Sequence, residues 1–355
     1  MSHVVLNCAV SSGLLGDPEV AAFFSAEADL AAMLDFESAL AEAEADAGVF
    51  SVQVARQIAA ACKDFQPDQS RLAAGIARDG MAVPSLVRQL REATGGAAAE
   101  YLHFDATSQD VIDTSLTLRL QQVNRVLETR LAHVCASLLD LDRRFGARQM
   151  MARTRMKSAL PIVVSHRIDG WRNPLLGLSK DFGQIQTAVH ALQFGGPVGT
   201  LDRLGASGSQ IRHQLAAGLG LSDPGAAWHT DRSRLVDYSF WLTKLATALG
   251  KIGHDVMLMA QDERSEITLA GAGAGGSSAM AHKKNPVKAE VLLALARFVS
   301  TLHAGLQQSS LHEQERSGTC WTLEWLLLPQ ICIATGTALN AAQNLLDSVD
   351  AIGKD

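Results

Sequence analysis

Aromatic residues are scarce in this chain, whose 355 residues include two tyrosines, eleven phenylalanines and five tryptophans. Aromatic and β-branched side chains favour strands, whereas the prevalent Ala, Leu, Gln, Glu and Arg favour helices, so we do not expect a large sheet. Proline is also scarce, and none occurs at positions 85–160 or 225–285. Because proline ends or kinks helices, these two gaps leave room for long unbroken helices.

Cysteine is rare as well, and no C-x-x-C pair occurs among Cys8, Cys62, Cys135, Cys320 and Cys332. An odd number of scattered cysteines indicates neither a disulfide framework nor a zinc site. Free, buried thiols in a reducing compartment are the simpler interpretation. We therefore predict a protein without a metal site.

Large blocks of basic or apolar residues are absent too. The net charge is −6 and no Lys/Arg block occurs, so a nucleic-acid partner is not expected. No run of about 18 uncharged apolar residues is found, which argues against a membrane partner. The N-terminal sequence MSHVVLNCAVSSGLLGD lacks the basic and apolar segments of a signal peptide. We expect a cytoplasmic protein.

Two stripes of apolar residues spaced three and four apart predict long helices. One helix is expected over residues 232–264, and others follow Pro161 and Pro286 and span residues 321–349. The stripes consist of Leu116, Leu120, Val123, Leu127, Leu131, Val134, Leu138 and Leu141, and of Leu235, Tyr238, Leu242, Leu245, Leu249, Ile252, Val256 and Met259. Neighbouring positions are also apolar, which favours a bundle in a large protein or oligomer over a two-stranded coiled coil.

The predicted fold is therefore all-α, with two domains. Breaks at Gly16-Asp17-Pro18, at Val83-Pro84 and at Gly95-Gly96 indicate shorter helices in the first hundred residues. We assign residues 1–101 to a small helical N-terminal domain and residues 102–355 to a central five-helix bundle.

The stretch HFDATSQDVIDTS, residues 103–115, has a histidine, hydroxyls and carboxylates where a long helix begins. Thr107 and Ser108 lie where the free N–H groups of a helix start would attract an anion. Helix capping, with Thr107 or Ser108 as the N-cap and Asp110 as an acidic residue of the first turn, is the more common reason for such a pattern.

Four further stretches mix polar residues with helix starts or turns. In residues 154–171, Arg155 and Lys157 precede an apolar helix and are either carboxylate ligands or surface charges. Residues 192–205 contain four glycines, which bend the chain. His229 in WHTDRSR is either a site residue or part of a helix start. In HEQERSGTCW, residues 312–321, the charges would more often lie on the surface.

The stretch GAGAGGSSAMAHKKNPVKAE, residues 271–290, joins a flexible Gly/Ala run to a cluster of reactive side chains. A mobile lid is the functional interpretation. A plain surface loop would not explain why Lys283, Asn285 and Glu290 come directly after the Gly/Ala run in the sequence.

Three of these stretches resemble the shared motifs of the fumarase/aspartase superfamily. GSSAMAHKKNP, residues 276–286, is similar to G-S-S-x-M-P-x-K-x-N-P, and HFDATSQDVIDT resembles H-x-G-x-T-S-x-D-x-x-D-T. Residues 154–161 stand in the place of the third motif. ATSQDVIDT with its Gln109, LQFGGPVGTLDRLG and WHTDRSR resemble the 3-carboxy-cis,cis-muconate cycloisomerase branch. The resemblance extends from about residue 80 onward.

The sequence departs from these motifs at a few positions. Ala281 replaces a motif proline, and Asp105 replaces a glycine, which affects the local backbone. Arg155 stands where the lyases of the superfamily carry histidine, and Pro84-Ser85 where adenylosuccinate lyases carry His-Asp. No room is left after residue 349 for the usual small C-terminal domain, which we expect to be missing.

The resemblance implies an intramolecular lactonisation of a tricarboxylate, with no cofactor, by a homotetramer whose active sites are shared among three subunits. It makes Ser277 the proton donor, with His103 and His229 as alternatives, and Lys283 and Asn285 stabilisers of an enolate-like intermediate. The implied substrate contacts are Thr107, Ser108, Gln109, Arg155, Lys157, Ser278, Met280 and Arg316. The rival hypotheses are a β-elimination lyase, such as adenylosuccinate lyase, and a non-catalytic helical scaffold.

Overall fold

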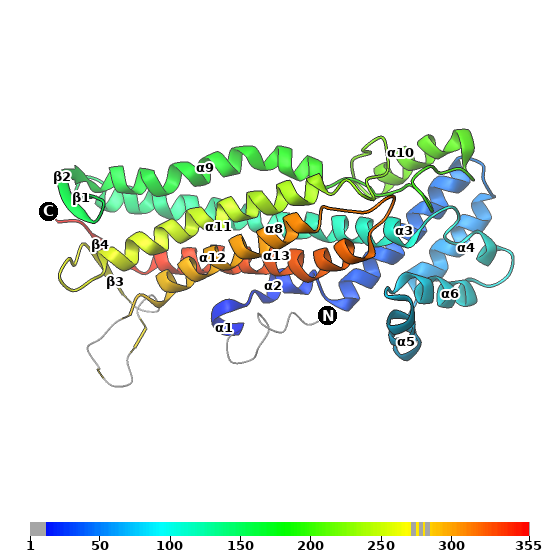
Figure 1. Ribbon diagram of the computed structural model, residues 1–355, viewed down its shortest axis with the longest axis horizontal. Helices are drawn as coiled ribbons and strands as arrows, with labels where there is room; N and C mark the ends of the chain where they lie inside the picture. Colours follow the sequence, from blue (N-terminus) through cyan, green and yellow to red (C-terminus); the bar gives the residue numbers. More distant parts are fainter. Residues whose placement is uncertain (1–11, 271–274, 277–279, 281–284, 355) are drawn as a thin grey trace.

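Five long helices form an elongated bundle in the computed structural model, which describes residues 12–270, 275–276, 280 and 285–354. They run side by side along the length of the molecule (Figure 1). The helices are α8 (Ser108–Phe145), α9 (Val164–Val189), α11 (Ser233–Met259), α12 (Val287–Gln308) and α13 (Gly318–Asp347). The predicted all-α bundle is confirmed.

The two predicted stripes form the centre of this bundle, because every one of their residues is buried. Helix α12 packs very close to α11: a side chain at Gly253 would place its Cβ 2.5 Å from the carbonyl oxygen of Ala289. The predicted end of α11 at residue 264 is wrong by five residues. After Met259 the chain turns through Ser265, which has a positive φ of 46°, and enters a short strand.

Most of the shorter helices gather at one end of the bundle, whereas the first two helices of the chain lie along its side, where Val20 packs into the bundle core (Figure 1). Their core also takes in Val111 and Ile112 of α8 and residues near 192–221, so the predicted boundary at Tyr101 stays a prediction. These elements are α1 (Ser12–Leu15), α2 (Pro18–Ala22), α3 (Ala26–Asp46), α4 (Val52–Lys63), α5 (Gln69–Asp79), α6 (Val83–Thr94), α7 (Ala98–Tyr101), the 3-10 turn η1 (Gly205–Ser207) and α10 (Gly208–Gly218).

Two small antiparallel sheets lie at the opposite end and were not predicted. Strands β1 (Gln149–Thr154) and β2 (Lys157–Val163) form a hairpin, and β3 (Ile267–Leu269) pairs with β4 (Val349–Ile352). Strand β2 is exposed along nearly all its length. It therefore lacks the alternation of apolar and polar residues that identifies a half-buried strand in a sequence.

Helices α12 and α13 are long and apolar enough to cross a membrane by length and composition alone. In α13, however, 72% of the most apolar window is buried inside the bundle. Buried core helices of this kind pass the same test, so these two helices are weak evidence for a membrane span.

Candidate active site

Asp110 organises the start of α8. Thr107 is the N-cap residue, as the capping interpretation proposed, and its backbone N–H donates to Asp110 Oδ2 at 3.1 Å. The N–H groups of Gly195 and Gly196 donate to the two carboxylate oxygens at 3.0 and 2.9 Å. His229 Nε2 lies 2.8 Å from Oδ1. Burial raises the pKa of Asp110 above its ordinary value, although these hydrogen bonds act to lower it.

A buried ion network lies one helical turn further along α8. Arg232 donates to both oxygens of Asp113, at 2.7 and 3.1 Å, and to both oxygens of Glu324, at 2.8 and 2.6 Å. Trp321 Nε1 also donates to Asp113 at 3.0 Å. Burial alone would raise the pKa of Asp113, but the Arg232 guanidinium holds it below its ordinary value. None of these four residues was predicted as a site residue from the sequence.

Gln109 connects this network to Arg316. Its amide Nε2 donates to the carbonyl oxygen of His229 at 2.9 Å and to Asp113 at 3.2 Å. Its Oε1 accepts from Arg316 Nε at 2.9 Å, and Arg316 Nη2 donates to the carbonyl oxygen of Pro197 at 3.1 Å. Gln109 is fully buried. Arg316 is half-buried rather than the surface charge that its stretch suggested.

His103 lies beside the same helix start. Its Nδ1 is 2.6 Å from Glu37 Oε1. Burial acts to lower the pKa of His103, but the Glu37 carboxylate outweighs it and the pKa is raised. Asp105 has a φ of 48°, in the left-handed region that glycine adopts readily. Aspartate tolerates this region better than most residues, so the replacement of glycine by Asp105 is compatible with this backbone.

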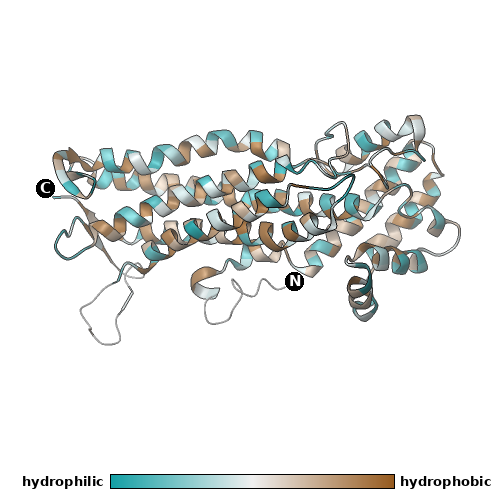
Figure 2. Cartoon of the chain, in the orientation of Figure 1, coloured by the Kyte–Doolittle hydropathy of each residue, from teal (hydrophilic) through white to brown (hydrophobic). Residues whose placement is uncertain are grey.

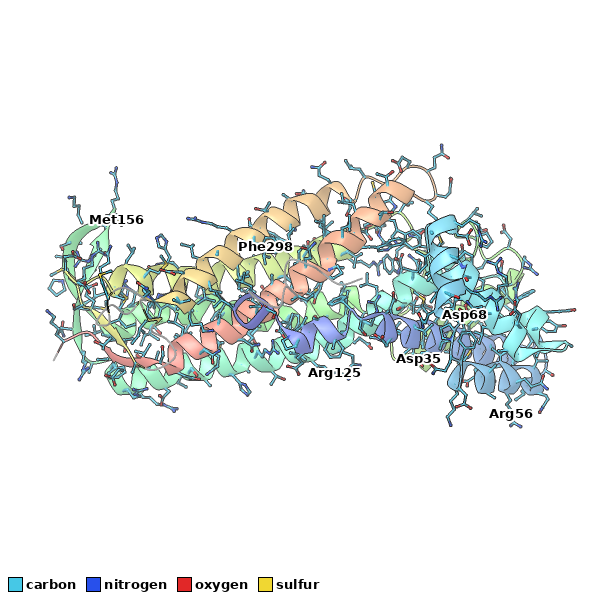
Figure 3. All side chains as sticks on the ribbon, turned by 90° about the horizontal axis from the view of Figure 1, so that it is seen from below. Asp35, Arg56, Asp68, Arg125, Met156 and Phe298 are labelled. Carbon is cyan, nitrogen blue, oxygen red and sulfur yellow. The ribbon has the colours of Figure 1, made fainter. Side chains whose placement is uncertain are left out.

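Arg155 occupies the tip of the β1–β2 hairpin. Arg155 and Met156 form a two-residue turn with φ values of 49° and 68°. Such turns favour Asn and Gly, so two long side chains here indicate a strained backbone. Lys157 and Met156 are exposed. Figure 3 shows Met156 at the end of the bundle opposite Asp68 and Arg56 of the shorter helices.

Asn285 closes the base of the connection between β3 and α12. Its backbone N–H donates to the carbonyl oxygen of Gly275 at 2.9 Å, and the N–H of Gly275 donates back at 2.8 Å. Met280, in the same connection, is exposed. Ser277, Ser278, Lys283 and most of the predicted lid lie outside the described residues.

The predicted site residues therefore form two groups, one at each end of the bundle (Figure 1). Helix α8 has 38 residues, and at 1.5 Å per residue it separates the two groups by about 57 Å. One group consists of His103, Thr107, Ser108, Gln109, His229 and Arg316, and the other of Arg155, Lys157, Met280 and Asn285. Within residues 12–270 and 285–354, no group of three or more His, Cys, Asp or Glu residues is placed to hold a metal ion.

Known proteins resemble this chain over nearly its whole length. The chain is 38% identical to a 3-carboxy-cis,cis-muconate cycloisomerase of Pseudomonas aeruginosa over 99% of its own length and 77% of the relative's. It superposes on a 3-carboxy-cis,cis-muconate lactonizing enzyme from Pseudomonas putida with a TM-score of 0.90 at 34% identity, covering 96% of this chain and 77% of that one.

A second solved structure agrees with this result. The cycloisomerase from Acinetobacter calcoaceticus gives a TM-score of 0.89 at 30% identity, covering 96% of this chain and 78% of that one. The family model described as "Lyase" matches residues 17–300. The chain therefore belongs to this lyase family, within the fumarase/aspartase superfamily that its motifs predicted.

Proposed function

We propose that the protein catalyses the lactonisation of 3-carboxy-cis,cis-muconate by intramolecular addition of a carboxylate to a conjugated double bond. The 38% identity to a cycloisomerase over 99% of the chain is the observation that carries this proposal. The site at the start of α8 supports it, because Gln109 holds the half-buried guanidinium of Arg316 beside this helix start, where it can pair with a substrate carboxylate.

The proposed reaction depends more on stabilising the negative charge of its intermediate than on a strong proton donor. Addition of the carboxylate produces an enolate-like anion, which donors fixed in advance stabilise best. Holding the nucleophilic carboxylate in line removes much of the entropic part of the barrier. We assign the carboxylates to Thr107, Ser108 and Arg316 at one end, and to Arg155 and Lys157 at the other. Gln109 is buried and holds Arg316, so we give it a positioning role.

The final proton goes to carbon, and Ser277 is the proposed donor, assisted by Lys283 and Asn285. His229 is the alternative with the clearest geometry. Its Nε2 is engaged by Asp110, so only its Nδ1 edge, which faces Gly199, is left for a ligand. His103, whose Nδ1 contacts Glu37, is the other alternative proton donor. Ser277→Ala should lower turnover by orders of magnitude, and near-normal turnover would refute the assignment.

We also propose a homotetramer with active sites shared among three subunits. A seven-carbon substrate cannot contact two groups of residues that lie about 57 Å apart in one chain. Exposed apolar side chains along the bundle, including Phe240 and Leu326 at 50% and 51%, support association. Figure 2 shows hydrophobic residues on outward parts of the long helices.

One spectrophotometric assay tests the reaction. Lactonisation consumes the diene of 3-carboxymuconate, so its absorbance should fall when the purified protein is added. An unchanged diene together with release of fumarate from adenylosuccinate would favour the lyase alternative, against which Arg155 argues. No activity on either substrate would favour the scaffold.

A cytoplasmic location, the absence of a cofactor and the absence of a nucleic-acid or membrane partner stay predictions.

A further inference from the structure

Glu37 of α3 meets His103 beside the start of α8. Its Oε1 lies 2.6 Å from His103 Nδ1. The Glu37 side chain is fully buried, and that of His103 is 14% exposed. The second carboxylate oxygen of Glu37, Oε2, is buried and has no hydrogen-bond partner among the described residues. Because an uncompensated charge in the interior is costly, this buried carboxylate depends on His103 as its partner.

The backbone at His103 is held in an unusual conformation. Its φ is 60°, in the left-handed region that residues with a side chain seldom adopt. Arg91 of α6 donates through Nη2 to the carbonyl oxygen of Leu102, the preceding residue, at 2.9 Å. Backbone in such a region persists only where its surroundings hold it, and it is common at functional sites. Glu37 and Arg91 thus hold His103 through its ring and through its backbone.

Charged groups from three helices act on the His103 ring. Burial acts to lower the pKa of His103, but the Glu37 carboxylate outweighs it, so the pKa is raised. Asp110 of α8 acts in the same direction as Glu37, and Arg91 opposes both. The ring therefore keeps its second proton above the ordinary histidine pKa of about 6.5.

Two other titratable groups lie near enough to Glu37 to be shifted by its charge. Burial, followed by Glu37 and Asp105, raises the pKa of Glu44 to about 9. Burial, followed by Glu37, raises the pKa of Cys62 of α4 to about 12. Both groups are therefore uncharged at neutral pH, and neither replaces His103 as the counter-charge of Glu37.

The charge of the ring decides what its other nitrogen can bind. In an imidazolium both nitrogens donate, so Nε2–H can donate to a carboxylate. In a neutral ring whose Nδ1–H faces Glu37, Nε2 is an acceptor and repels a carboxylate. Within the described part of the chain, the ring makes its hydrogen bond through Nδ1 alone. Nε2 is thus left for a ligand.

We propose that Glu37 is a positioning residue of the active site, which keeps His103 a cation whose Nε2–H binds a carboxylate of the substrate. This inference rests on the proposed function, and it makes His103 a carboxylate ligand rather than a proton donor. His103 lies shortly before Thr107, the N-cap residue of α8. It therefore adds a cation to the end of the site that holds Arg316.

Calorimetric titration of the assembled protein with propane-1,2,3-tricarboxylate at pH 7.5 and pH 5.5 tests the role of Glu37. In Glu37→Gln the burial of His103 is no longer opposed by a contacting carboxylate, so the ring should be neutral at pH 7.5. We expect binding at least about tenfold weaker than in the unaltered protein, as for the loss of a charged hydrogen bond. The ratio of the two dissociation constants should fall at pH 5.5, where more of the rings are protonated.

Two further variants of α3 sharpen this comparison. Glu37→Asp keeps a carboxylate and should bind more tightly than Glu37→Gln at pH 7.5. Glu44→Gln is the matched control, because Glu44 is 1% exposed on the same helix and is uncharged at this pH. It should bind like the unaltered protein. A ratio for Glu37→Gln that is the same at both pH values would show a merely structural role and overturn the proposal.

A double variant tests whether Glu37 acts through His103. His103→Gln should weaken binding at pH 7.5 as much as Glu37→Gln does, and Glu37→Gln/His103→Gln should add little to either. Additive effects would overturn the proposal. If Glu37→Gln does not fold, His103→Gln still decides, because unchanged binding there would remove the cation from the site.

Turnover of 3-carboxymuconate gives the remaining outcomes. Glu37→Gln should raise KM at least about tenfold at pH 7.5 and leave kcat nearly unchanged. A large loss of kcat with unchanged KM would overturn the binding role and make His103 a proton donor. If the unaltered protein turned over no muconate but bound the tricarboxylate with this dependence on pH and on Glu37, the proposed function would fail and the role of Glu37 would stand.

Discussion

His229 Nε2 lies 2.8 Å from Asp110 Oδ1, although 119 residues separate the two in sequence. This contact joins the start of α8 to the loop before α11, and the glycine N–H groups at positions 195 and 196 bind the same carboxylate. Three separate segments therefore meet on one buried acid. Asp110 therefore holds these three segments in position, in addition to placing a carboxylate in the site.

Replacing Asp110 tests this dependence. In Asp110→Asn, one carboxylate oxygen becomes an NH₂ group facing donors, so at least one buried N–H loses its acceptor. We expect the free energy of unfolding to fall by about 2–4 kcal/mol, the range for breaking a buried charged hydrogen-bond network. Urea denaturation measures it. The control Asp35→Asn, at an exposed position, should change stability by less than about 0.5 kcal/mol, and an equal loss in both variants would contradict the argument.

Glu44 predicts an unusual pH dependence of stability. It is 1% exposed, and both its carboxylate oxygens are without a hydrogen-bond partner among the described residues. Burial, followed by the nearby Glu37 and Asp105, raises the pKa of Glu44 to about 9. The folded state therefore keeps a proton that the unfolded state, with a glutamate pKa of about 4.3, releases.

Because the folded state binds more protons, the contribution of Glu44 to stability is fully present below about pH 4.3 and is lost as pH rises toward about 9. Glu44→Gln should remove this decline and stabilise the protein at pH 8, by at least about 1 kcal/mol. Thermal unfolding at pH 5 and pH 8 measures the difference. Glu42→Gln, at an exposed position on the same helix, is the matched control; an identical pH profile for both variants would refute the prediction.

Gln109 and Arg316 should act as one unit in substrate binding. Arg316→Gln removes the cation that we propose binds a substrate carboxylate, and Gln109→Ala releases the guanidinium that it holds at 2.9 Å. We expect each variant to raise KM by at least about tenfold, and the double variant to add little beyond Arg316→Gln. Steady-state kinetics on the unaltered protein, the two single variants and the double variant measure the coupling free energy between Gln109 and Arg316. Fully additive effects would show that Gln109 acts by another route.

The hairpin tip should show a conflict between stability and function. Arg155→Asn places a residue that tolerates positive φ in the turn, where Arg155 has a φ of 49°. We expect a gain of about 0.5–1 kcal/mol in unfolding free energy together with a raised KM. Met156→Gly, at the neighbouring turn position, should stabilise similarly with little change in KM. An unchanged KM for Arg155→Asn would return Arg155 to the surface-charge interpretation.

Helices with long apolar stripes could be predicted from the sequence, and the residue pairs that build the site could not. The stripe from Leu235 to Met259 repeats with the period of a helix, so periodicity alone identifies α11. By contrast, Arg232 meets Asp113 across 119 residues and Glu324 across 92, and no local pattern marks such pairs. The hairpin was missed because β2 is exposed on both faces and so has no period to detect.

Mixing two inactive variants tests whether the active site is shared. Asn285→Ala and Arg316→Ala change residues at opposite ends of one chain, and each should lower kcat/KM. We expect a fall of about 10²–10³-fold for Asn285→Ala, through lost anion stabilisation, and of at least about tenfold for Arg316→Ala, through weaker substrate binding. When subunits are mixed through unfolding and refolding, about a quarter of shared sites receive the unaltered residue from both contributing chains. Activity should then recover toward a quarter of the unaltered value. A site complete within one chain would recover nothing, since every chain carries one of the two changes.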